Sequence, residues 1–512
     1  MAHKTLVGGT AYNISGGKSM VDGTGYSIKG GQTKVDGTGY NISFGQDAYA
    51  MLYSDGNMIF QMGDAVASGK TLTASYTGFD ETSYPNYSSV PWNSKRNAIK
   101  RVNGTGEVAP YSLDRWFYNC ANLTVVNTSS LDFDNVVSMV YTYYNCQNLT
   151  TATIHGNNVS NIAFAFYNCK RMSSSPVCGP NVTNMHQTYH NCNGITGSPV
   201  CGDNVVNMAY TYTNCNRLTG SPACGDKVVD MSGTYRNASW LNGQPICGPN
   251  VTVMQSTYYN CSNLTGSPVC GPNVTVLDST YYNCRKLTGA PACGNNVTMM
   301  NQAYYYCHAL TGAPVCGNNV TSMGSTYYNC SKLTGSPVCG PNVISMSNTY
   351  CNCRNLTGSP VCGPNVTNMS NAYRNCSNLK GAPACGSNVT NMAYAYYGCT
   401  KLTGIAKCYS NVTNMAYAYY GCFNVTTASM FDSNVTNMAY AYHNCSNITS
   451  SPSCGDNVTN MVYAYYNCSK MKGNAQCGTN VTNMAYAYYR CQNINGTAQC
   501  GNKVTSMASA YE

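Results

Sequence analysis

Cysteine is the reactive residue with the most regular spacing in this sequence. Of the 31 cysteines, one series recurs every 23 residues from Cys146 to Cys491, and a second follows it nine residues later, from Cys178 to Cys500. The two series lose members one at a time, at Ala238 and Phe431, whereas disulfide partners should disappear together. A spacing of nine is also unlike a close pair of zinc ligands. We therefore predict mostly free thiols, buried as small apolar side chains in a protein made in a reducing compartment.

Other residue patterns do not predict catalysis. Residues 116–512 contain nine carboxylates, which do not pair at any repeated spacing, and no phosphate loop, nucleophile elbow or dinucleotide fingerprint is present. The histidines lie outside any metal-binding motif: His3, His155, His186, His190, His308 and His443. We therefore expect no enzyme activity, no cofactor and no metal.

Composition excludes several further classes. Only 9% of the 512 residues are charged, against about 25% in ordinary soluble domains. The net charge of +9 is spread over the whole chain and does not indicate a nucleic-acid partner. No apolar run approaches the roughly 20 residues of a membrane span, and the first residues carry no secretory signal pattern. We expect neither nucleic-acid binding nor membrane insertion, and synthesis in a host cytoplasm.

The 23-residue period sets the architecture. Counted from the first cysteine of each unit, position −10 is valine, position −7 is methionine or aliphatic, position −3 is aromatic in 17 units, and position +3 is aliphatic. Met438, Tyr442 and Cys445 show the i, i+4, i+7 spacing of a short helix, and the Val-Thr-Asn-Met and Gly-Ser-Pro-Val-Cys pieces are typical of short strands. One unit cannot bury this apolar set, so the pattern predicts an α/β repeat solenoid of about 17 coils over residues 116–512. Asparagines before valine and before cysteine are expected to form ladders that satisfy turn backbone groups.

The unit resembles a known repeat class. The string N-V-T-N-M-x-Y-A-Y-Y-N-C-S-N-L-T is similar to BspA-like leucine-rich repeats over roughly residues 111–512. The resemblance implies a leucine-rich-repeat-like solenoid and, among its functions, a bacterial surface adhesin. One departure is that Gly-Ser-Pro-Val-Cys replaces the Leu-x-Leu strand of the family. Because proline cannot donate to a ladder, a continuous sheet is not expected there.

The N-terminal part follows other patterns. Residues 1–45 contain Tyr12, Tyr26 and Tyr40 at intervals of 14, which predicts three β-hairpins. Residues 46–115 are expected to form a β-rich attachment module with a hairpin on the Asp-Gly turn at Asp55. The Gly-Thr-x-Tyr-x-Ile triplets resemble N-terminal segments of tailed-phage structural proteins, a weaker match than the repeats.

Two surface columns are the candidate binding sites. Position −5 is tyrosine in five consecutive units, which suits sugars or a protein partner, unless the column packs only within the coil. These residues are Tyr394, Tyr417, Tyr440, Tyr463 and Tyr486. Cations gather just after the first cysteine and would attract anionic glycans, unless they only solubilise the rod. They are Lys170, Arg171, Arg217, Arg285, Lys286, Lys332, Arg354, Lys401 and Lys470.

Together these patterns predict a non-enzymatic virion protein of a tailed phage, serving attachment or host-surface recognition through a rigid solenoid. The alternative is a bacterial cell-surface adhesin of the same repeat class. Expected partners are host surface glycans, and further copies or other virion proteins contacted through the N-terminal modules and residues 502–512. In that final unit Val504, Met507 and Tyr511 occupy core columns without a polar repeat after them.

Overall fold

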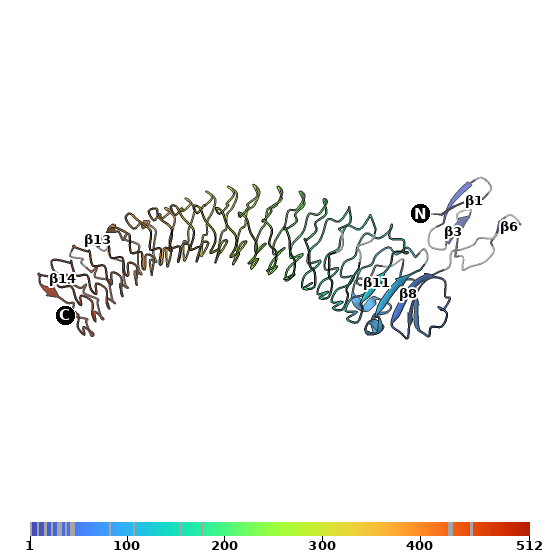
Figure 1. Ribbon diagram of the computed structural model, residues 1–512, viewed down its shortest axis with the longest axis horizontal. Helices are drawn as coiled ribbons and strands as arrows, with labels where there is room; N and C mark the ends of the chain where they lie inside the picture. The colour runs from blue at the N-terminus through green and yellow to red at the C-terminus, as the bar shows by residue number, and fades with distance from the viewer. Residues whose placement is uncertain are drawn as a thin grey trace.

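The protein is an arched rod with a sheet-containing module at its N-terminal end (Figure 1). The computed structural model describes the chain over the following residues, with side chains from residue 47 onward: 3–7, 10–14, 18–21, 24–27, 33–35, 38–40, 47–80, 83–105, 108–152, 156–175, 178–428, 434–450 and 454–512. No helix among these residues is long and apolar enough to span a membrane.

Three antiparallel strand pairs lie at the start of the chain, where the 14-residue period predicts hairpins. Each pair is separate, and its register is regular along both strands. The pairs are β1 (His3–Val7) with β2 (Thr10–Ile14), β3 (Lys18–Val21) with β4 (Thr24–Ser27), and β5 (Thr33–Val35) with β6 (Thr38–Tyr40).

A five-stranded sheet joins the module to the solenoid. Its order is β11-β10-β8-β7-β9, with bounds β7 (Ala48–Tyr53), β8 (Asn57–Met62), β9 (Leu72–Thr77), β10 (Arg101–Gly104) and β11 (Val125–Asn127). Gly56, at φ +83°, completes the turn between β7 and β8. Two 3₁₀ helices, η1 (Tyr87–Ser89) and η2 (Asn93–Ala98), follow β9.

The module shares one hydrophobic core with the first coils. Trp92 is fully buried and packs edge-on against Trp116 with ring centroids 5.4 Å apart, and its indole N–H donates to the Trp116 carbonyl at 2.5 Å. Phe60 stacks on Trp116 at 5.0 Å. Because β10 also pairs in parallel with β11 of the solenoid, the module covers the N-terminal end of the repeat core.

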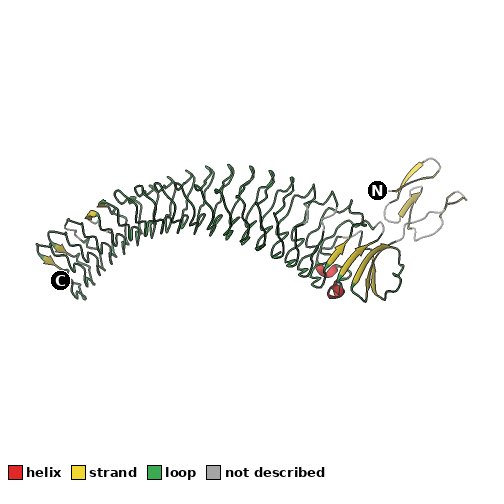
Figure 2. Cartoon of the chain, in the orientation of Figure 1, coloured by secondary structure: helices red, strands yellow, loops and turns green. Residues whose placement is uncertain are grey.

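Stacked turns, rather than helices, join neighbouring coils (Figure 2). Alternate residues from Met139 to Asn145 donate their N–H to the next coil at 2.7–3.1 Å, and Thr142 and Tyr144 between them donate to the carbonyl three positions earlier. Tyr141 and Asn145 have φ of 59° and 60°. The predicted short helix is therefore wrong, because left-handed residues at positions −5 and −1 interrupt the right-handed backbone that an α-helix requires. The repeat solenoid itself and its buried columns are confirmed.

The buried aromatic column forms a continuous stack along the rod. Successive rings at position −3, from Phe117 to Tyr511, lie 5.2–5.8 Å apart and nearly parallel. From Tyr212 to Tyr419, and again at Tyr488, the tyrosine hydroxyl also bonds the backbone on the opposite side of its coil. Tyr281, for example, donates to the Val269 carbonyl at 2.7 Å and accepts from the Val269 N–H at 3.0 Å. The hydroxyls thus satisfy backbone groups in the Gly-Ser-Pro-Val-Cys segment, which accounts for tyrosine rather than phenylalanine in this column.

Proline decides where that segment pairs as a strand. Proline occupies the position in every unit from Pro176 to Pro383, and the described part of these units contains no strand. Parallel pairs form where it is replaced: β12 (Gly404–Ala406) with β13 (Val425–Ala428), and β14 (Ala475–Gln476) with β15 (Ala498–Gln499). The expected interruption of the sheet by proline is confirmed, because proline offers no N–H to the neighbouring coil.

Both asparagine columns form ladders, and the column before valine bonds backbone carbonyls as predicted, whereas the column before cysteine bonds side chain to side chain. At position −1, from Asn214 to Asn283, each side-chain N–H₂ donates to the amide oxygen of the preceding coil, as Asn214 does to Asn191 at 2.7 Å. In the column before valine, Asn250 donates to the Asp226 carbonyl at 2.9 Å. Asparagine also suits position −1 because it adopts positive φ more readily than most residues.

Candidate functional site

The five predicted tyrosines form one ordered column on the surface of the C-terminal coils. Tyr394 has φ of 59°. Its ring lies at the surface, where it is half-buried. Successive rings, from Tyr394 through Tyr417, Tyr440 and Tyr463 to Tyr486, stack 4.5–4.7 Å apart within 11° of parallel. The structure therefore brings all five predicted residues together.

A second aromatic column lies directly beside the first. At position −2, Tyr397, Tyr420, His443, Tyr466 and Tyr489 stack 4.5–5.1 Å apart. The columns touch, with ring centroids 5.4–6.0 Å apart within each coil from 394 to 466. Together these ten rings are called the tyrosine face below.

Charge on the tyrosine face is low near neutral pH. Burial lowers the pKa of His443 to about 4, so its imidazole is neutral. Burial, followed by the neighbouring Tyr440, raises the pKa of Tyr417, which keeps that phenol protonated. The Arg374 guanidinium lies 5.4 Å from the Tyr394 ring and 5.2 Å from the Tyr397 ring. This cation, at the N-terminal margin of the face, was not among the sequence-predicted residues.

The stacking determines which part of each ring a ligand can reach. Because the ring faces lie against one another, the flat faces of the interior rings are covered by their neighbours. What remains at the surface is a strip of ring edges and hydroxyl groups. Ring edges carry positive electrostatic potential, and the hydroxyls both donate and accept hydrogen bonds. This arrangement favours a protein partner over sugars stacked on ring faces.

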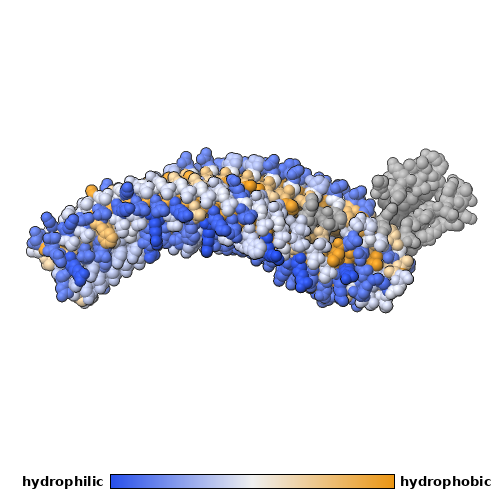
Figure 3. All heavy atoms as spheres, in the orientation of Figure 1, coloured by the Kyte–Doolittle hydropathy of each residue, from blue (hydrophilic) through white to orange (hydrophobic). Residues whose placement is uncertain are grey.

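The rings of the tyrosine face stack more closely than the buried rings do. Their centroids are 4.5–5.1 Å apart, where those of the buried stack are 5.2–5.8 Å apart. Figure 3 shows blue and white atoms over most of the visible rod, with an orange stripe near the convex edge. The tyrosine face is thus a half-exposed aromatic surface.

The predicted cations lie on a different part of the coil. All nine are exposed, and they follow the first cysteine by one or two residues. Lys401 donates to the Asn378 side chain at 2.6 Å and Lys470 to Asn447 at 2.8 Å. Within the described ranges, the one ion pair joins Lys70 and Asp55 of the N-terminal module. The described cations of the solenoid therefore form no ion pair with a carboxylate.

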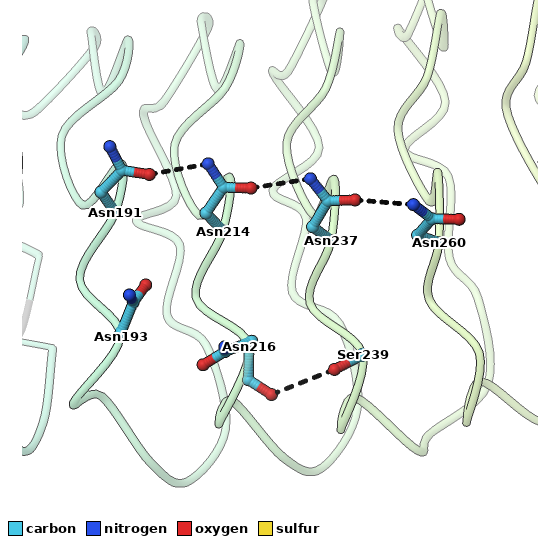
Figure 4. Close-up of a pocket in the computed structure, with 7 residues that line it drawn as sticks. All are labelled: Asn191, Asn193, Asn214, Asn216, Asn237, Ser239 and Asn260. Atoms are coloured by element: carbon cyan, nitrogen blue, oxygen red, sulfur yellow. Dashed lines mark hydrogen bonds between the residues drawn. The ribbon is translucent and has the colours of Figure 1, made fainter.

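Polar grooves run beside this edge in the middle of the rod. One, of about 480 Å³, is lined by the ladder Asn191, Asn214, Asn237 and Asn260 together with Asn193, Asn216 and Ser239 (Figure 4). Another, of about 460 Å³, is lined by Thr219, Trp240, Asn242, Asn263, Thr265 and Lys286. Trp240 was missed in the sequence, although it stands alone as tryptophan in a column of mostly asparagine and basic residues.

The cysteines are free and chemically quiet in the described structure. Members of the first series are buried, and their Sγ atoms donate to carbonyls of the preceding coil, as Cys284 does to Tyr258 at 3.0 Å. Burial raises the pKa of Cys215 to about 12 and that of Cys178, in the second series, to about 11. In the described part of the chain, no three His, Cys, Asp or Glu side chains meet as metal ligands.

Comparison with known proteins places the repeats in a class. Residues 111–219 and 251–380 match the family described as BspA type leucine-rich repeat region. Residues 344–451, 367–476 and 390–500 match a family described as Mycoplasma protein of unknown function, DUF285. The solenoid is therefore of the leucine-rich-repeat kind, with BspA-type repeats over the two first ranges. No curated protein matches the chain.

Solved leucine-rich repeat proteins of three bacteria resemble the chain at low identity. A leucine-rich repeat protein from Bacteroides ovatus is 13% identical, covering 81% of this chain and 94% of its own, with a TM-score of 0.45. A leucine-rich repeat protein from Eubacterium ventriosum is 14% identical over 91% and 92%, with a TM-score of 0.28. A leucine rich cell surface protein from Faecalibacterium prausnitzii is 12% identical over 90% and 96%, with a TM-score of 0.26. The resemblance to tailed-phage proteins finds no support in these matches.

Proposed function

We propose that this chain is a non-enzymatic adhesin-type scaffold on a bacterial surface, and that its tyrosine face binds a protein partner. The single observation that carries the proposal is the face itself: ten half-buried rings, stacked without interruption over five coils. The BspA-type repeats support it, because that class includes surface adhesins. The rival assignment, to a phage virion, has no comparable support, and contacts of the N-terminal modules and of residues 502–512 with other copies stay predictions.

The physical basis is preorganisation. Tyrosine and arginine are enriched at the energetically important centres of protein interfaces. Here the rings are fixed by their stacking before a ligand arrives, so binding costs little additional side-chain entropy. Arg374 and the other cations of residues 374–512 outnumber the acidic residues there by eight to three. A partner with an acidic, hydrogen-bonding surface fits this face best.

Serine substitutions test the face without disturbing the coil. Serine already occupies position −5 at positive φ in Ser256, Ser279 and Ser325, so Tyr417→Ser, Tyr440→Ser and Tyr463→Ser together should fold. We expect this triple variant to lose at least tenfold in affinity for the target cell surface, or ~1.4 kcal/mol. The matched Tyr→Phe triple keeps the rings, as Phe164 does in another coil. Binding that survives in the folded serine variant would reject the face.

Localisation is tested separately. Antibodies against the solenoid should label intact cells of the producing bacterium, and shaving with protease should remove the label. Labelling confined to purified phage particles would instead establish the virion assignment.

A further inference from the structure

Trp240 is exposed in a setting where the fold gives no reason for exposure. Its side chain is 53% exposed, whereas Trp92 and Trp116 are buried at 0% and 2%. It occupies position +2, where neighbouring units carry Arg217 and Asn263. An indole at such a position contributes nothing to the repeat core. It therefore requires a different explanation from the stacked columns.

The groove around Trp240 offers unused hydrogen-bonding capacity. The Asn242 amide oxygen accepts from the Gly220 N–H at 2.9 Å, which leaves its N–H₂ group directed to other partners. Asn263 uses its N–H₂ group on the Ser239 carbonyl at 2.8 Å, which leaves its amide oxygen. Thr265 donates to the Asn242 carbonyl at 2.8 Å and retains acceptor capacity. Donors and acceptors thus surround one apolar ring, the combination that hydroxyl-rich ligands need.

The edge that carries the groove holds basic residues and no acidic ones. Positions +1 to +4 of the 16 units from Cys146 onward hold eleven Lys or Arg residues and no Asp or Glu. Lys286 lines the groove itself, and Arg217 precedes Trp240 in the same column. At a coil spacing of ~4.8 Å, the cations average about one per 7 Å. That density is low for duplex DNA, which carries about one phosphate per 1.7 Å.

We propose that the Trp240 groove binds an acidic glycan chain, with uronic-acid-type carboxylates attracted by the basic edge. The indole packs against the apolar face of one sugar ring. The amides of Asn242 and Asn263 and the hydroxyl of Thr265 bond its hydroxyl groups, and Lys286 lies opposite a carboxylate. The chain lies along the edge, so that further cations meet further carboxylates. This site is separate from the tyrosine face and does not rest on the proposed function.

Tryptophan fluorescence reports on the site directly, because the other two tryptophans are buried. The full-length protein is titrated with an oligogalacturonate hexasaccharide, with neutral cellohexaose, and with a single-stranded DNA oligonucleotide. We expect the acidic hexasaccharide to change the exposed-tryptophan emission and to protect it from acrylamide quenching. Binding should weaken with added salt, because exposed charges are screened.

The variants make the test specific. Trp240→Asn installs the residue that Asn263 provides in the same column, so the coil should fold, and binding by calorimetry should fall at least about tenfold. Lys286→Asn should weaken binding of the acidic hexasaccharide and leave any residual binding of neutral cellohexaose unchanged. Lys470→Asn is the matched control, because Lys470 lies ten coils from Trp240 in the same column. This variant should bind the acidic hexasaccharide as the wild type does.

Four results would overturn the proposal. They are no binding of the acidic hexasaccharide by the wild type, equal binding by Trp240→Asn, equal binding of cellohexaose, and tighter binding of the DNA. The tyrosine-face serine variant should keep glycan binding. Loss of cell attachment in that variant alone, or of glycan binding in Trp240→Asn alone, separates the two sites.

Discussion

Raising the pH should unfold the solenoid, because its core holds many thiols that cannot ionise in place. Burial raises the pKa of Cys120, Cys215, Cys307 and Cys422 to about 12, from an ordinary value of 9.0. The unfolded chain therefore releases these protons first. Stability is fully present below about pH 9 and falls as the pH rises from there toward the folded pKa.

The magnitude follows from linkage. At pH 10 each such thiol favours the unfolded state by about 1.4 kcal/mol, so four of them contribute roughly 5–6 kcal/mol. This equals the lower end of the 5–15 kcal/mol typical for a folded domain. Other thiols of the first series, such as Cys284, and buried tyrosines such as Tyr281 have pKa values raised in the same direction. We expect a cooperative transition near pH 10.

The assay follows folding and ionisation together. Near-ultraviolet circular dichroism reports the tyrosine stack, and thiolate absorbance reports the cysteines, under reductant and in the absence of air. A variant with Cys215→Ala, Cys307→Ala and Cys422→Ala should unfold at higher pH, and Ala238 shows that alanine fits this column. Thiolates that form near pH 9 while the dichroism is unchanged would refute the reasoning. So would an identical midpoint in the alanine variant.

Three further perturbations test the coil architecture. Asn237 has φ of 63° and takes part in two ladder bonds, so Asn237→Ala should cost about 2–3 kcal/mol in urea unfolding from strain and the two lost bonds. Asn237→Gly should cost less, since Gly398 fills the same column, and equal losses would exclude the strain. Trp92→Ala should lower stability by about 3–5 kcal/mol in calorimetry, because it empties the buried centre of the N-terminal module, and a loss below about 1 kcal/mol would contradict the shared core. Replacing Pro268 and Pro291 by alanine should create a strand pair like those near the C-terminus, with slowed amide exchange at the new N–H groups, whereas fast exchange there would show that proline is not what prevents pairing.

Much of the fold is determined by the residue type at each position of the repeat, and could be predicted from the sequence. Valine at −10, methionine at −7 and the aromatic residue at −3 must be buried in any stacked arrangement. The proline position correctly predicted the loss of strands, because its effect is local and chemical. Free cysteines could be predicted because Ala238 and Phe431 each replace one cysteine of a would-be pair while the other cysteine remains.

The backbone conformation of each coil could not be predicted from the sequence in the same way. An i, i+4, i+7 spacing is shared by a helix and by the stacked turns seen here, so Met438, Tyr442 and Cys445 could not distinguish them. The useful signal was elsewhere, in the glycines and asparagines at position −1 and in Gly233 at position −5, which favour positive φ. The orientation of the tyrosine rings, and the groove at Trp240, depend on contacts between coils that no single repeat contains.

The hydrogen bonds between coils run along the rod, and this gives the protein a particular response to tension. Pulling on a chain end peels the terminal coil, breaking its bonds one after another instead of all together. Each coil releases 23 residues, which extend to about 75–80 Å, while the rod loses only about 5 Å. Because the coils are nearly identical, each should yield at a similar force. A tether built this way lengthens in equal steps under flow and dissipates the load gradually, so an attachment at its far end is spared an abrupt pull.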